Sequence, residues 1–444
     1  MPYLYPMSLE NPPLHLNEDF NYALDALEKQ GRSMFITGRA GTGKSTLLRL
    51  LRQTTRKKMA ILAPTGVAAL NVQGQTIHSF FGFPPRIITP SEASRRETNK
   101  RLIKLYQSLE VLVIDEISMV RADMIDGINR FLQVNRGNLQ PFGGVQTVFF
   151  GDLFQLPPVV TRDPVEAQYF TDYYNSPYFF AANALREAEF DMEMLELRKV
   201  YRQESRHFLR LLEAVRTNTV DYDDLDDLNE RYTPDLKETE GYITLCARNA
   251  TADKINQTAL QRLDSEEFVY TAKVEGAFDP TLYPVESALK LRLGAQVMFV
   301  KNDLTERQYV NGTIGKITQL EKDTIVVTVT EDNGKKRRIE VPLEAWEIIR
   351  YKTDDSGGIG TETIGTFTQY PLKLAWAITI HKSQGKTFDK VIIDLGAGAF
   401  EHGQLYVALS RCRTLEGIVL RRPIRHNDVI TDERVVAFYE TAFR

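Results

Sequence analysis

A run of glycines, one lysine and one serine near the start of the chain has the types and spacing needed to bind a polyphosphate. Residues 38–45 read GRAGTGKS, the pattern GxxxxGK[ST], between an apolar run typical of a strand and an amphipathic run typical of a helix. Glycines let several backbone N–H groups point at one anion, and the following helix adds its positive dipole end. We predict a phosphate-binding loop, with Lys44 on the β- and γ-phosphates and Ser45 on a bridging Mg²⁺ ion. The predicted nucleotide contacts here are Gly38, Ala40, Gly41, Thr42, Gly43, Lys44, Ser45 and Thr46.

Two carboxylates follow the next strongly apolar segment. Residues 111–116 read VLVIDE, as in a strand that is buried on both faces and ends at the edge of a parallel sheet. Downstream of a phosphate loop, this pair predicts that Asp115 holds Mg²⁺, usually through water, and that Glu116 is the general base for the attacking water. A further apolar run, 147–150, leads to Gln155, whose carboxamide is placed to sense the γ-phosphate. ATP and Mg²⁺ are the expected ligands.

The elements that must position these groups are short apolar runs separated by helical patterns. Helical spacing predicts a helix within 14–31, and a strand is predicted at 59–63 besides the apolar runs above. The pattern restarts near residue 191 and contains no second phosphate loop. Its short buried strands are predicted at 242–246, 374–380, 390–395 and 417–420. We therefore predict two α/β layers of the same kind, of which only the first binds nucleotide directly.

Two stretches depart from the α/β pattern. Three prolines between residues 84 and 90 interrupt regular structure, which predicts a small inserted element after residue 74. From 297 to 367, β-branched residues alternate with turn signals, so we predict a small inserted antiparallel barrel. The turn signals are Asn311-Gly312, Asn333-Gly334 and Gly357-Gly358.

Charged residues are concentrated in three runs. Five cations between residues 95 and 104 follow a predicted helix, where a solvated face and a nucleic-acid contact both remain open. For the basic run 335–338 we favour a hairpin tip that keeps a sheet edge soluble. The acidic run 221–227 is interpreted as a solvated loop. The net charge of −4 argues against a protein that coats polyanions, but it leaves room for a local basic channel.

Length and composition indicate a multidomain globular protein. The chain has 444 residues, of which 43% are hydrophobic and 26% charged, and no run of eighteen apolar residues. The first residues lack the pattern of a secretory signal, so we expect a cytoplasmic location, nucleoid-associated in a bacterium. Cys246 and Cys412 stand far apart in sequence, which favours buried thiols over a disulfide or a zinc site.

In order and spacing, these motifs resemble the Pif (petite integration frequency) family of DNA helicases, a branch of superfamily one related to RecD. Stretch 196–217 looks like the signature motif that separates this family from RecD proper. One departure is visible, because Phe20 stands about where the family often has an adenine-reading glutamine. The matching stretches are 38–45, 63–69, 76–80, 114–119, 151–159, 197–203, 377–387 and 406–411.

The resemblance implies an enzyme that hydrolyses ATP, moves 5′ to 3′ on single-stranded DNA and unwinds duplex DNA. It further implies that Arg202 and Arg411 stabilise charge on the γ-phosphoryl group, and that Gly385 contacts the nucleotide. With Lys44, Glu116 and Gln155, these arginines make up the expected catalytic set. Phe80 remains open between a DNA contact and a core residue. The DNA contacts implied are Pro64, Thr65, Gly66, His78, Phe80, His381 and Ser383.

The implied architecture is two RecA-like parallel-sheet domains with a small wedge element and an SH3-like β-barrel inserted. The first domain would comprise 1–73 and 100–190 around a wedge at 74–99, and the second 191–263 and 369–444 around a barrel region at 264–368. The expected partners are single-stranded, forked or tailed DNA and G-quadruplex DNA, bound by a monomer, with roles in replication, repair and telomere maintenance. Two alternatives stay open: a translocating ATPase that displaces proteins without unwinding duplex, and a nucleotide-gated DNA-binding module.

Overall fold

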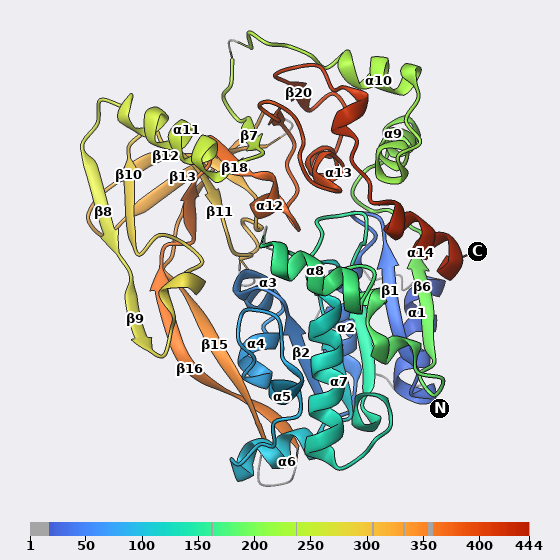
Figure 1. Ribbon diagram of the computed structural model, residues 1–444. Helices are drawn as coiled ribbons and strands as arrows, with labels where there is room; N and C mark the ends of the chain where they lie inside the picture. Colours follow the sequence, from blue (N-terminus) through green and yellow to red (C-terminus); the bar gives the residue numbers. More distant parts are fainter. Residues whose placement is uncertain are drawn as a thin grey trace, which may run out of the picture.

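Two parallel sheets form the framework of the chain, as the sequence predicts (Figure 1). The computed structural model describes residues 17–160, 163–236, 238–303, 306–331, 334–353 and 358–443. Leu16, Asn333 and Gly357 belong to predicted elements and lie outside these ranges. The first sheet has six strands in the order β3-β2-β4-β5-β1-β6. They are β1 (Ser33–Gly38), β2 (Met59–Ala63), β3 (Gln75–Thr76), β4 (Val111–Ile114), β5 (Gln146–Phe150) and β6 (Met192–Leu197).

Helices cover both faces of the first sheet, which explains why its strands are continuously apolar. All four residues of β4 are buried, as are the last four of β5. The predicted helix before the phosphate loop is α1, continued by a π-helical turn at Ala26–Gln30. The helices are α1 (Glu18–Asp25), α2 (Lys44–Thr54), α3 (Gly66–Asn71), α4 (Ile77–Phe81), α5 (Pro90–Ala93), α6 (Lys100–Ser108), α7 (Ala122–Arg136) and α8 (Pro164–Tyr173).

The second sheet has four parallel strands in the order β18-β7-β19-β20. Buried apolar residues of both sheets belong to one continuous core cluster. The strands are β7 (Ile243–Cys246), β18 (Ala377–Thr379), β19 (Val391–Asp394) and β20 (Ile418–Leu420). The helices beside them are α9 (Arg206–Thr217), α10 (Tyr222–Asn229), α11 (Asn249–Gln261), α12 (Ile380–Ser383) and α13 (Gln404–Leu409).

Three predicted elements differ from the structure. The segment after residue 191, expected to open the second layer, forms β6 and pairs in parallel with β1 in the first sheet. The strand expected at 374–380 is two strands in different sheets, because the chain passes from β17 (Leu372–Leu374) to β18. The acidic run 221–227, expected as a loop, enters α10, since Asp221 and Asp224 form a reciprocal capping box at its N-terminus.

The predicted antiparallel insertion is present, but its last third leaves the small sheet. Strands β11 (Gln296–Phe299), β12 (Ile314–Leu320), β13 (Ile325–Thr330), β14 (Lys336–Glu340) and β17 form a five-stranded sheet. Beside it, β8 (Glu267–Thr271) pairs with β10 (Ala288–Arg292). The long pair β15 (Glu344–Thr353) and β16 (Ile359–Gln369), joined by β9 (Lys273–Gly276), reaches down to α6 of the first domain (Figure 1).

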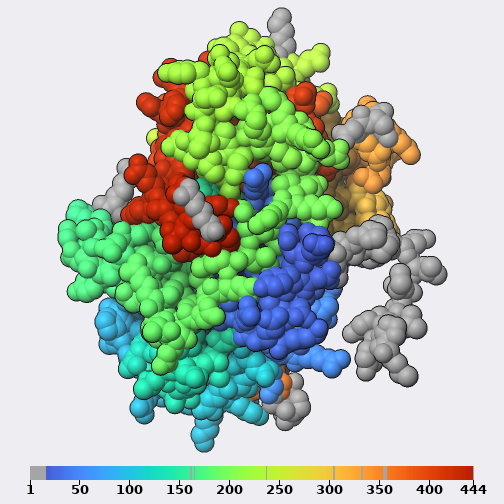
Figure 2. All heavy atoms as spheres, turned by 90° about the vertical axis from the view of Figure 1, so that its right-hand side faces the viewer, coloured from blue at the N-terminus to red at the C-terminus, as the bar shows by residue number. Residues whose placement is uncertain are grey.

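The C-terminal helix α14 (Glu433–Phe443) returns to the first domain. Its Phe438 stacks on Phe180, with ring centroids 4.3 Å apart. Figure 2 shows this red segment lying against the green residues that follow the first domain's last helix. In the ranges that the structure describes, no helix is long and apolar enough to cross a membrane.

Candidate nucleotide site between the two sheets

The glycine-rich loop joins β1 to α2, the strand-to-helix arrangement that a phosphate loop requires. Gly38, Gly41 and Gly43 have φ angles of 145°, 84° and 90°, which side chains rarely tolerate. At position 41 there is also no room for a side chain, because a Cβ there would lie 2.6 Å from the Cβ of Arg202. The loop conformation therefore depends on glycine for both backbone freedom and the close approach of a segment from beyond β6.

Lys44 lies at the start of α2 with its ammonium group folded over the loop. Its Nζ donates to the carbonyl oxygens of Gly38, at 2.6 Å, and Arg39, at 3.1 Å. Removal from water lowers the pKa of Lys44, although Asp152 and Glu116 oppose the shift. A phosphate at the loop would offer this ammonium a far stronger partner than two carbonyl groups.

Asp115 and Glu116 stand at the carboxyl end of β4, beside the loop. Burial, followed by the neighbouring Glu116 carboxylate, raises the pKa of Asp115 to about 7. Burial also raises the pKa of Glu116. Glu116 has a φ of 51°, which is strained for a residue with a side chain. Two crowded carboxylates at a phosphate loop form a site whose negative charge a cation would relieve.

The residues present fit a magnesium ion held mainly by the nucleotide. The described residues contain no group of three or more His, Cys, Asp or Glu side chains that could hold a metal alone. Mg²⁺ in nucleotide sites needs only one or two protein ligands, because phosphates and waters supply the rest. The exposed Ser45 hydroxyl and the Asp115 carboxylate are suited to that arrangement.

Gln384, which the sequence analysis did not single out, joins the two domains at this site. It follows α12, and its Nε2 donates to Glu116 Oε2 and to Gln155 Oε1, both at 3.2 Å. Gln155 is itself 7% exposed and donates to Asp152 at 3.2 Å. One carboxamide of the second domain thus contacts both the predicted base and the predicted γ-phosphate sensor. The sequence signal that could have identified Gln384 was its position within the stretch 377–387, which resembles the family.

Asp152 anchors a second set of contacts across the cleft, to Arg216 and Tyr406, neither of which was predicted as a site residue. Arg216, on α9, lies 3.5 Å from it, and the Tyr406 hydroxyl of α13 donates to it at 3.2 Å. The same hydroxyl accepts from the N–H of Ala40 in the glycine loop at 2.9 Å. Burial would raise the pKa of Asp152, but Arg216 and Lys44 outweigh it and lower the pKa.

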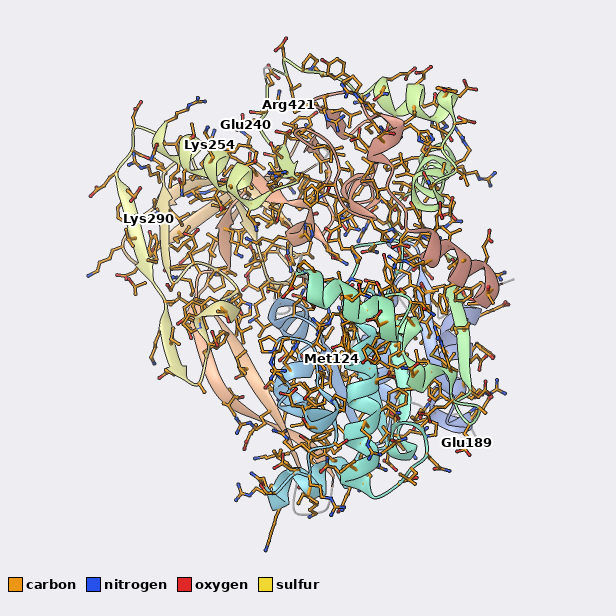
Figure 3. The ribbon with its side chains drawn as sticks, viewed as in Figure 1. Met124, Glu189, Glu240, Lys254, Lys290 and Arg421 are labelled. Atoms are coloured by element: carbon orange, nitrogen blue, oxygen red, sulfur yellow. The ribbon has the colours of Figure 1, made fainter. Side chains whose placement is uncertain are left out.

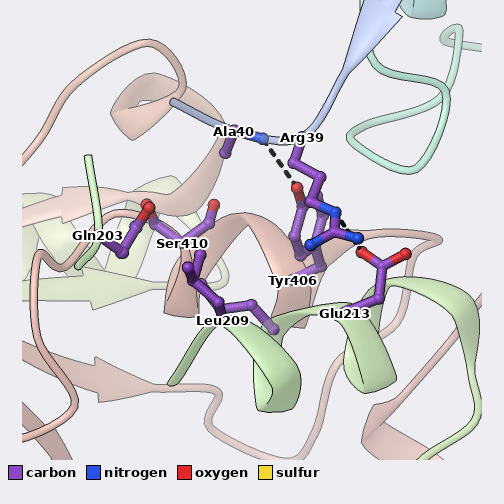
Figure 4. A pocket seen from close by; sticks show the side chains of 8 residues that line it. Arg39, Ala40, Gln203, Leu209, Glu213, Tyr406 and Ser410 are labelled. Carbon is purple, nitrogen blue, oxygen red and sulfur yellow. Dashed lines mark hydrogen bonds and ion pairs between the residues drawn. The ribbon is translucent and has the colours of Figure 1, made fainter. Parts of the chain in front are cut away.

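Figure 4 shows the place where the glycine loop meets the second domain. Arg39 of the loop forms an ion pair with Glu213 of α9 at 2.8 Å, and Tyr406 lies beside it. These residues line a cavity of only about 10 Å³, enough for roughly one water. The loop and the second domain are therefore in direct contact.

The two predicted arginines also lie at this junction. Arg202 donates to the carbonyl oxygen of Ser410 at 3.0 Å. Arg411 is 1% exposed and donates to the carbonyl of Val407 at 2.9 Å and to the Ser410 hydroxyl at 2.8 Å. Burial and then the charge of Arg202 lower the pKa of Arg411 to about 9. A cation in that environment gains from any nearby anion, and the Glu116 carboxylate already acts on it.

Phe20 packs in the core beneath the loop and is 3% exposed. Its ring would lie 3.0 Å from a Cβ at Gly43. It therefore supports the glycine loop as a packing residue. Next to it, the side chain of Asn17 donates to the Tyr201 hydroxyl at 3.2 Å.

The predicted DNA contacts form two groups, one in each domain. Thr65 caps α3, and His78 lies on α4, where burial and then Arg121 lower its pKa. His381 of α12 is exposed, within 2.8 Å of Glu401. Not all of the predicted DNA contacts are accessible to a ligand in this structure.

Two of the predicted DNA contacts, Phe80 and Ser383, are buried, and a third, Gly66, is covered by another residue. Phe80 is 4% exposed and its ring meets those of Phe81, Tyr106 and Tyr351, so of its two open interpretations the core residue fits this arrangement. The Ser383 hydroxyl donates to Ile380 at 2.7 Å within its own helix. Leu282 of the insertion lies directly over Gly66. Pro64 is partly buried and Gly385 is exposed.

Comparison with known proteins identifies relatives along the whole chain. The family model of PIF1-like helicases matches residues 16–225, that of the UvrD-like helicase C-terminal domain matches 374–419, and that of the DNA helicase Pif1 2B domain matches 282–320. The ATP-dependent DNA helicase Pif1 of Bdellovibrio bacteriovorus is 34% identical over 96% of this chain and 93% of its own. The zebrafish (Danio rerio) ATP-dependent DNA helicase PIF1 is 35% identical over 87% of this chain, which spans only 58% of that relative's length.

Solved structures agree with this relationship. Pif1 from Bacteroides sp in complex with ADP-AlF4 has 39% identity and a TM-score of 0.88, covering 96% of this chain and 98% of that one. The same bacterial protein bound to ssDNA has 40% identity and covers 96% of both chains, with a TM-score of 0.68. At nearly equal identity, this chain therefore superposes more closely on the ADP-AlF4 complex than on the ssDNA-bound structure.

Proposed function

The chain belongs to the PIF1-like helicase family, and we propose that it is an ATP-dependent DNA helicase that moves 5′ to 3′ on single-stranded DNA. The observation that carries this proposal is the position of Gln384, which contacts Glu116 and Gln155 of the first domain from the second. A binding module needs nucleotide contacts in one domain only. A motor needs the hydrolysis site to include both, because that makes hydrolysis and domain movement one event.

Within the site, we assign roles by position and chemistry. Lys44 and the N–H groups of the glycine loop hold the β- and γ-phosphates. Ser45 and Asp115 would hold Mg²⁺, which supplies neutralising charge at the phosphates. Glu116 accepts the proton of the attacking water, and Gln155 orients that water or the γ-phosphate. The second domain supplies positive charge for the transition state.

Arg202 and Arg411 are the proposed sources of that charge. Both lie at the junction, and both have their pKa lowered by burial, so little solvation energy opposes their attraction to a phosphoryl group. Their bonds to Ser410 show that they share one anchoring point. Small movements of α13 therefore shift both guanidinium groups together. An arginine of this kind accelerates phosphoryl transfer by about 10³ to 10⁵.

We propose a DNA track that crosses both domains. Thr65 and His78 belong to the first domain and His381 to the second, so a strand crossing both would be gripped alternately as the cleft changes. Phosphates would be held by N–H and hydroxyl groups, with His78 or His381 available for base stacking. The lower TM-score against the ssDNA-bound relative supports a change of domain arrangement when DNA binds. Forked or tailed duplexes are the proposed unwinding substrates.

A strand-displacement assay tests this function. Duplexes carrying a 5′ or a 3′ single-stranded tail are mixed with the protein, ATP and Mg²⁺, and strand separation is followed by fluorescence. We expect unwinding of the 5′-tailed duplex alone, with hydrolysis stimulated by single-stranded DNA. Hydrolysis without unwinding would instead show a translocase that displaces bound proteins, and neither activity would leave a nucleotide-gated binding module.

A further inference from the structure

A second charged groove lies at the far edge of the first sheet from the glycine loop. It has a volume of about 940 Å³ and runs between α6 and β15. In the sheet order, β3 at this edge and β1 are four strand spacings apart, which is roughly 19 Å. Figure 1 places α6 at the opposite end of the molecule from α13. The groove is therefore separate from the nucleotide site.

The walls of the groove are fixed against each other. Tyr351 of β15 accepts the N–H of Ile61 through its hydroxyl at 2.9 Å, and its backbone N–H donates to Gln75 at 3.3 Å. Its ring meets Phe80 edge-on, with centroids 5.8 Å apart. Because β2, β3 and α4 all hold this one residue, the groove is a built feature of this structure.

The lining is strongly cationic although the whole chain has a net charge of −4. Of the fourteen lining residues, five are cationic and only Glu362 is anionic. On α6 the cations recur at helical spacing along one face, and on β15 two cations flank Tyr351. The five are Lys100, Arg101, Lys104, Arg350 and Lys352.

Most of this charge has no ion-pair partner in the part of the chain that the structure describes. Lys352 lies 3.5 Å from Glu362. Among the described residues, Lys100, Arg101, Lys104 and Arg350 form no ion pair, and their side chains are exposed. Cations gathered in one groove repel one another and concentrate anions from solution. Asp354 and Asp355, which follow β15 in the sequence, lie outside the described residues.

The rings at the groove favour duplex over single-stranded DNA. Phe80 and Tyr351 are each 4% exposed, so neither offers a face on which a base could stack, as single-strand sites do. What remains is exposed ammonium and guanidinium groups, which recognise phosphates without reading sequence. The nine residues of α6 extend roughly 13 Å, alongside about four phosphates of one DNA strand.

We propose that the groove between α6 and β15 binds the phosphate backbone of duplex DNA, separately from the single-strand track. This inference rests on the proposed helicase function, since it names a second part of the same substrate. It gives the protein a contact with the duplex arm of a tailed substrate. The contact belongs to the arrangement in which β15 packs on the first domain.

The test compares two double variants with equal loss of charge. Arg101→Gln with Arg350→Gln removes one cation from each wall of the groove. Lys254→Gln with Lys290→Gln removes two exposed lysines from α11 and β10, which lie in the upper part of the view, away from α6 at its lower end (Figures 1 and 3). Binding of a short blunt duplex and of oligo-dT is measured by fluorescence anisotropy over a range of salt concentrations, and folding by thermal melting.

We expect the groove variant to bind duplex about tenfold more weakly than the parent, with the slope of log K against log salt reduced by about 2. The control should match the parent for duplex, and both variants should retain oligo-dT-stimulated hydrolysis. Equal duplex affinity in groove variant and parent overturns the inference. So does an equal loss of oligo-dT binding, which would make the groove part of the single-strand track.

The proposed function and this inference are contradicted by different results. A parent that shows no DNA-stimulated hydrolysis contradicts the helicase assignment. Duplex affinity of the two variants still decides what the groove binds in that case.

Discussion

Arg216 and Asp152 form an ion pair of 3.5 Å between α9 and the segment that follows β5, and each residue is 1% exposed. The guanidinium carbon of Arg216 lies 4.2 Å from the centre of the Phe154 ring. Burial would lower the pKa of Arg216, but Asp152 and its other neighbours raise it. A charged pair so far from water fixes α9 to the first domain beside the hydrolysis site.

We predict that Arg216→Ala destabilises the protein by about 3 to 5 kcal/mol, because it leaves the Asp152 carboxylate buried without its main partner. Urea unfolding at neutral pH measures the effect. Arg206→Ala on the same helix is the matched control, since Arg206 is exposed and takes part in no ion pair among the described residues. That change should cost less than about 1 kcal/mol. Similar losses for both variants would show that the buried pair has no special weight.

Lys44→Ala should abolish ATP hydrolysis while single-stranded DNA still binds. The variant loses the ammonium group that lies over the glycine loop, whereas the proposed DNA contacts are untouched. Phosphate release and anisotropy with oligo-dT measure the two activities. Lys57→Ala is the control, because Lys57 also donates to a backbone carbonyl, that of Leu27, but lies outside the loop. Normal turnover by Lys44→Ala would contradict the site assignment.

Glu116→Gln should bind ATP and Mg²⁺ yet hydrolyse ATP at least 10²-fold more slowly, since a carboxamide cannot accept the proton of water. Single-turnover hydrolysis and nucleotide affinity separate the two effects. Glu110→Gln, at the entrance to the same strand, should behave as the parent. If Glu116→Gln turns over at the parent rate, the general base is another residue.

The first domain could be predicted closely because each of its signals is local. The strands β2, β4 and β5 lie within a residue of the runs identified as apolar, and the loop begins and ends where its glycines require. The sequence also contains the signal for the capping box of Asp221 and Asp224, but the acidic run around it was interpreted as a loop. A helix start depends on which acids are spaced three apart, not on how many there are.

The cleft contacts could not be predicted in the same way. Arg216 pairs with a residue 64 positions away, and Tyr406 with one 254 positions away. A local sequence pattern cannot predict such a pairing, because the pairing depends on how the two sheets pack against each other. The hairpin β15–β16 is a similar case, since its alternation fits any antiparallel pair and only the burial of Tyr351 against the first domain shows where it lies.

We expect Lys373, on β17, to make the free energy of unfolding depend on pH. Burial and then the charge of Lys382 lower its pKa to about 8 from the ordinary 10.5. Between pH 8 and 10.5 the unfolded state therefore binds more protons than the folded state, so the free energy of unfolding rises with pH across that window. Below pH 8 the cost of the buried charge is present in full.

Lys373→Met should consequently raise the free energy of unfolding at pH 7 by on the order of 1 to 2 kcal/mol, less than the full shift because the side chain is only partly buried. It should also reduce the rise between pH 8 and 10.5, leaving the part due to Lys386, whose pKa burial likewise lowers to about 8. Chemical unfolding at pH 7 and pH 10 checks both. The exposed Lys254→Met is the control, and an equal gain there would point to hydrophobicity instead of charge.

Arg411 tests the coupling between the domains, because its surroundings allow two roles. Its guanidinium donates to Val407, Ser410 and, at 3.3 Å, the carbonyl of Lys386, so it stabilises the end of α13. The same group faces the charge of Glu116 across the cleft. A structural arginine and one that completes the hydrolysis site therefore occupy the same position.

The substitutions Arg411→Lys and Arg411→Ala separate these roles. Lysine keeps the charge but not the planar fork that can hold two phosphoryl oxygens. We expect Arg411→Lys to bind ATP within a few-fold of the parent and to lose roughly 10²-fold or more in DNA-stimulated hydrolysis, together with unwinding. A merely structural role would lower thermal stability and leave the rate per folded molecule unchanged.

A distance measurement completes the test. Engineered cysteines at the exposed positions Arg49 and Asp253 carry one label on each domain, and the two native cysteines are buried. With a non-hydrolysable ATP analogue and single-stranded DNA, the parent should show a change in distance that Arg411→Ala lacks, because no guanidinium then draws the second domain to the γ-phosphate. Should Arg411→Ala hydrolyse ATP as fast as the parent, the arginine acts on its own helix and the hydrolytic charge comes from Arg202.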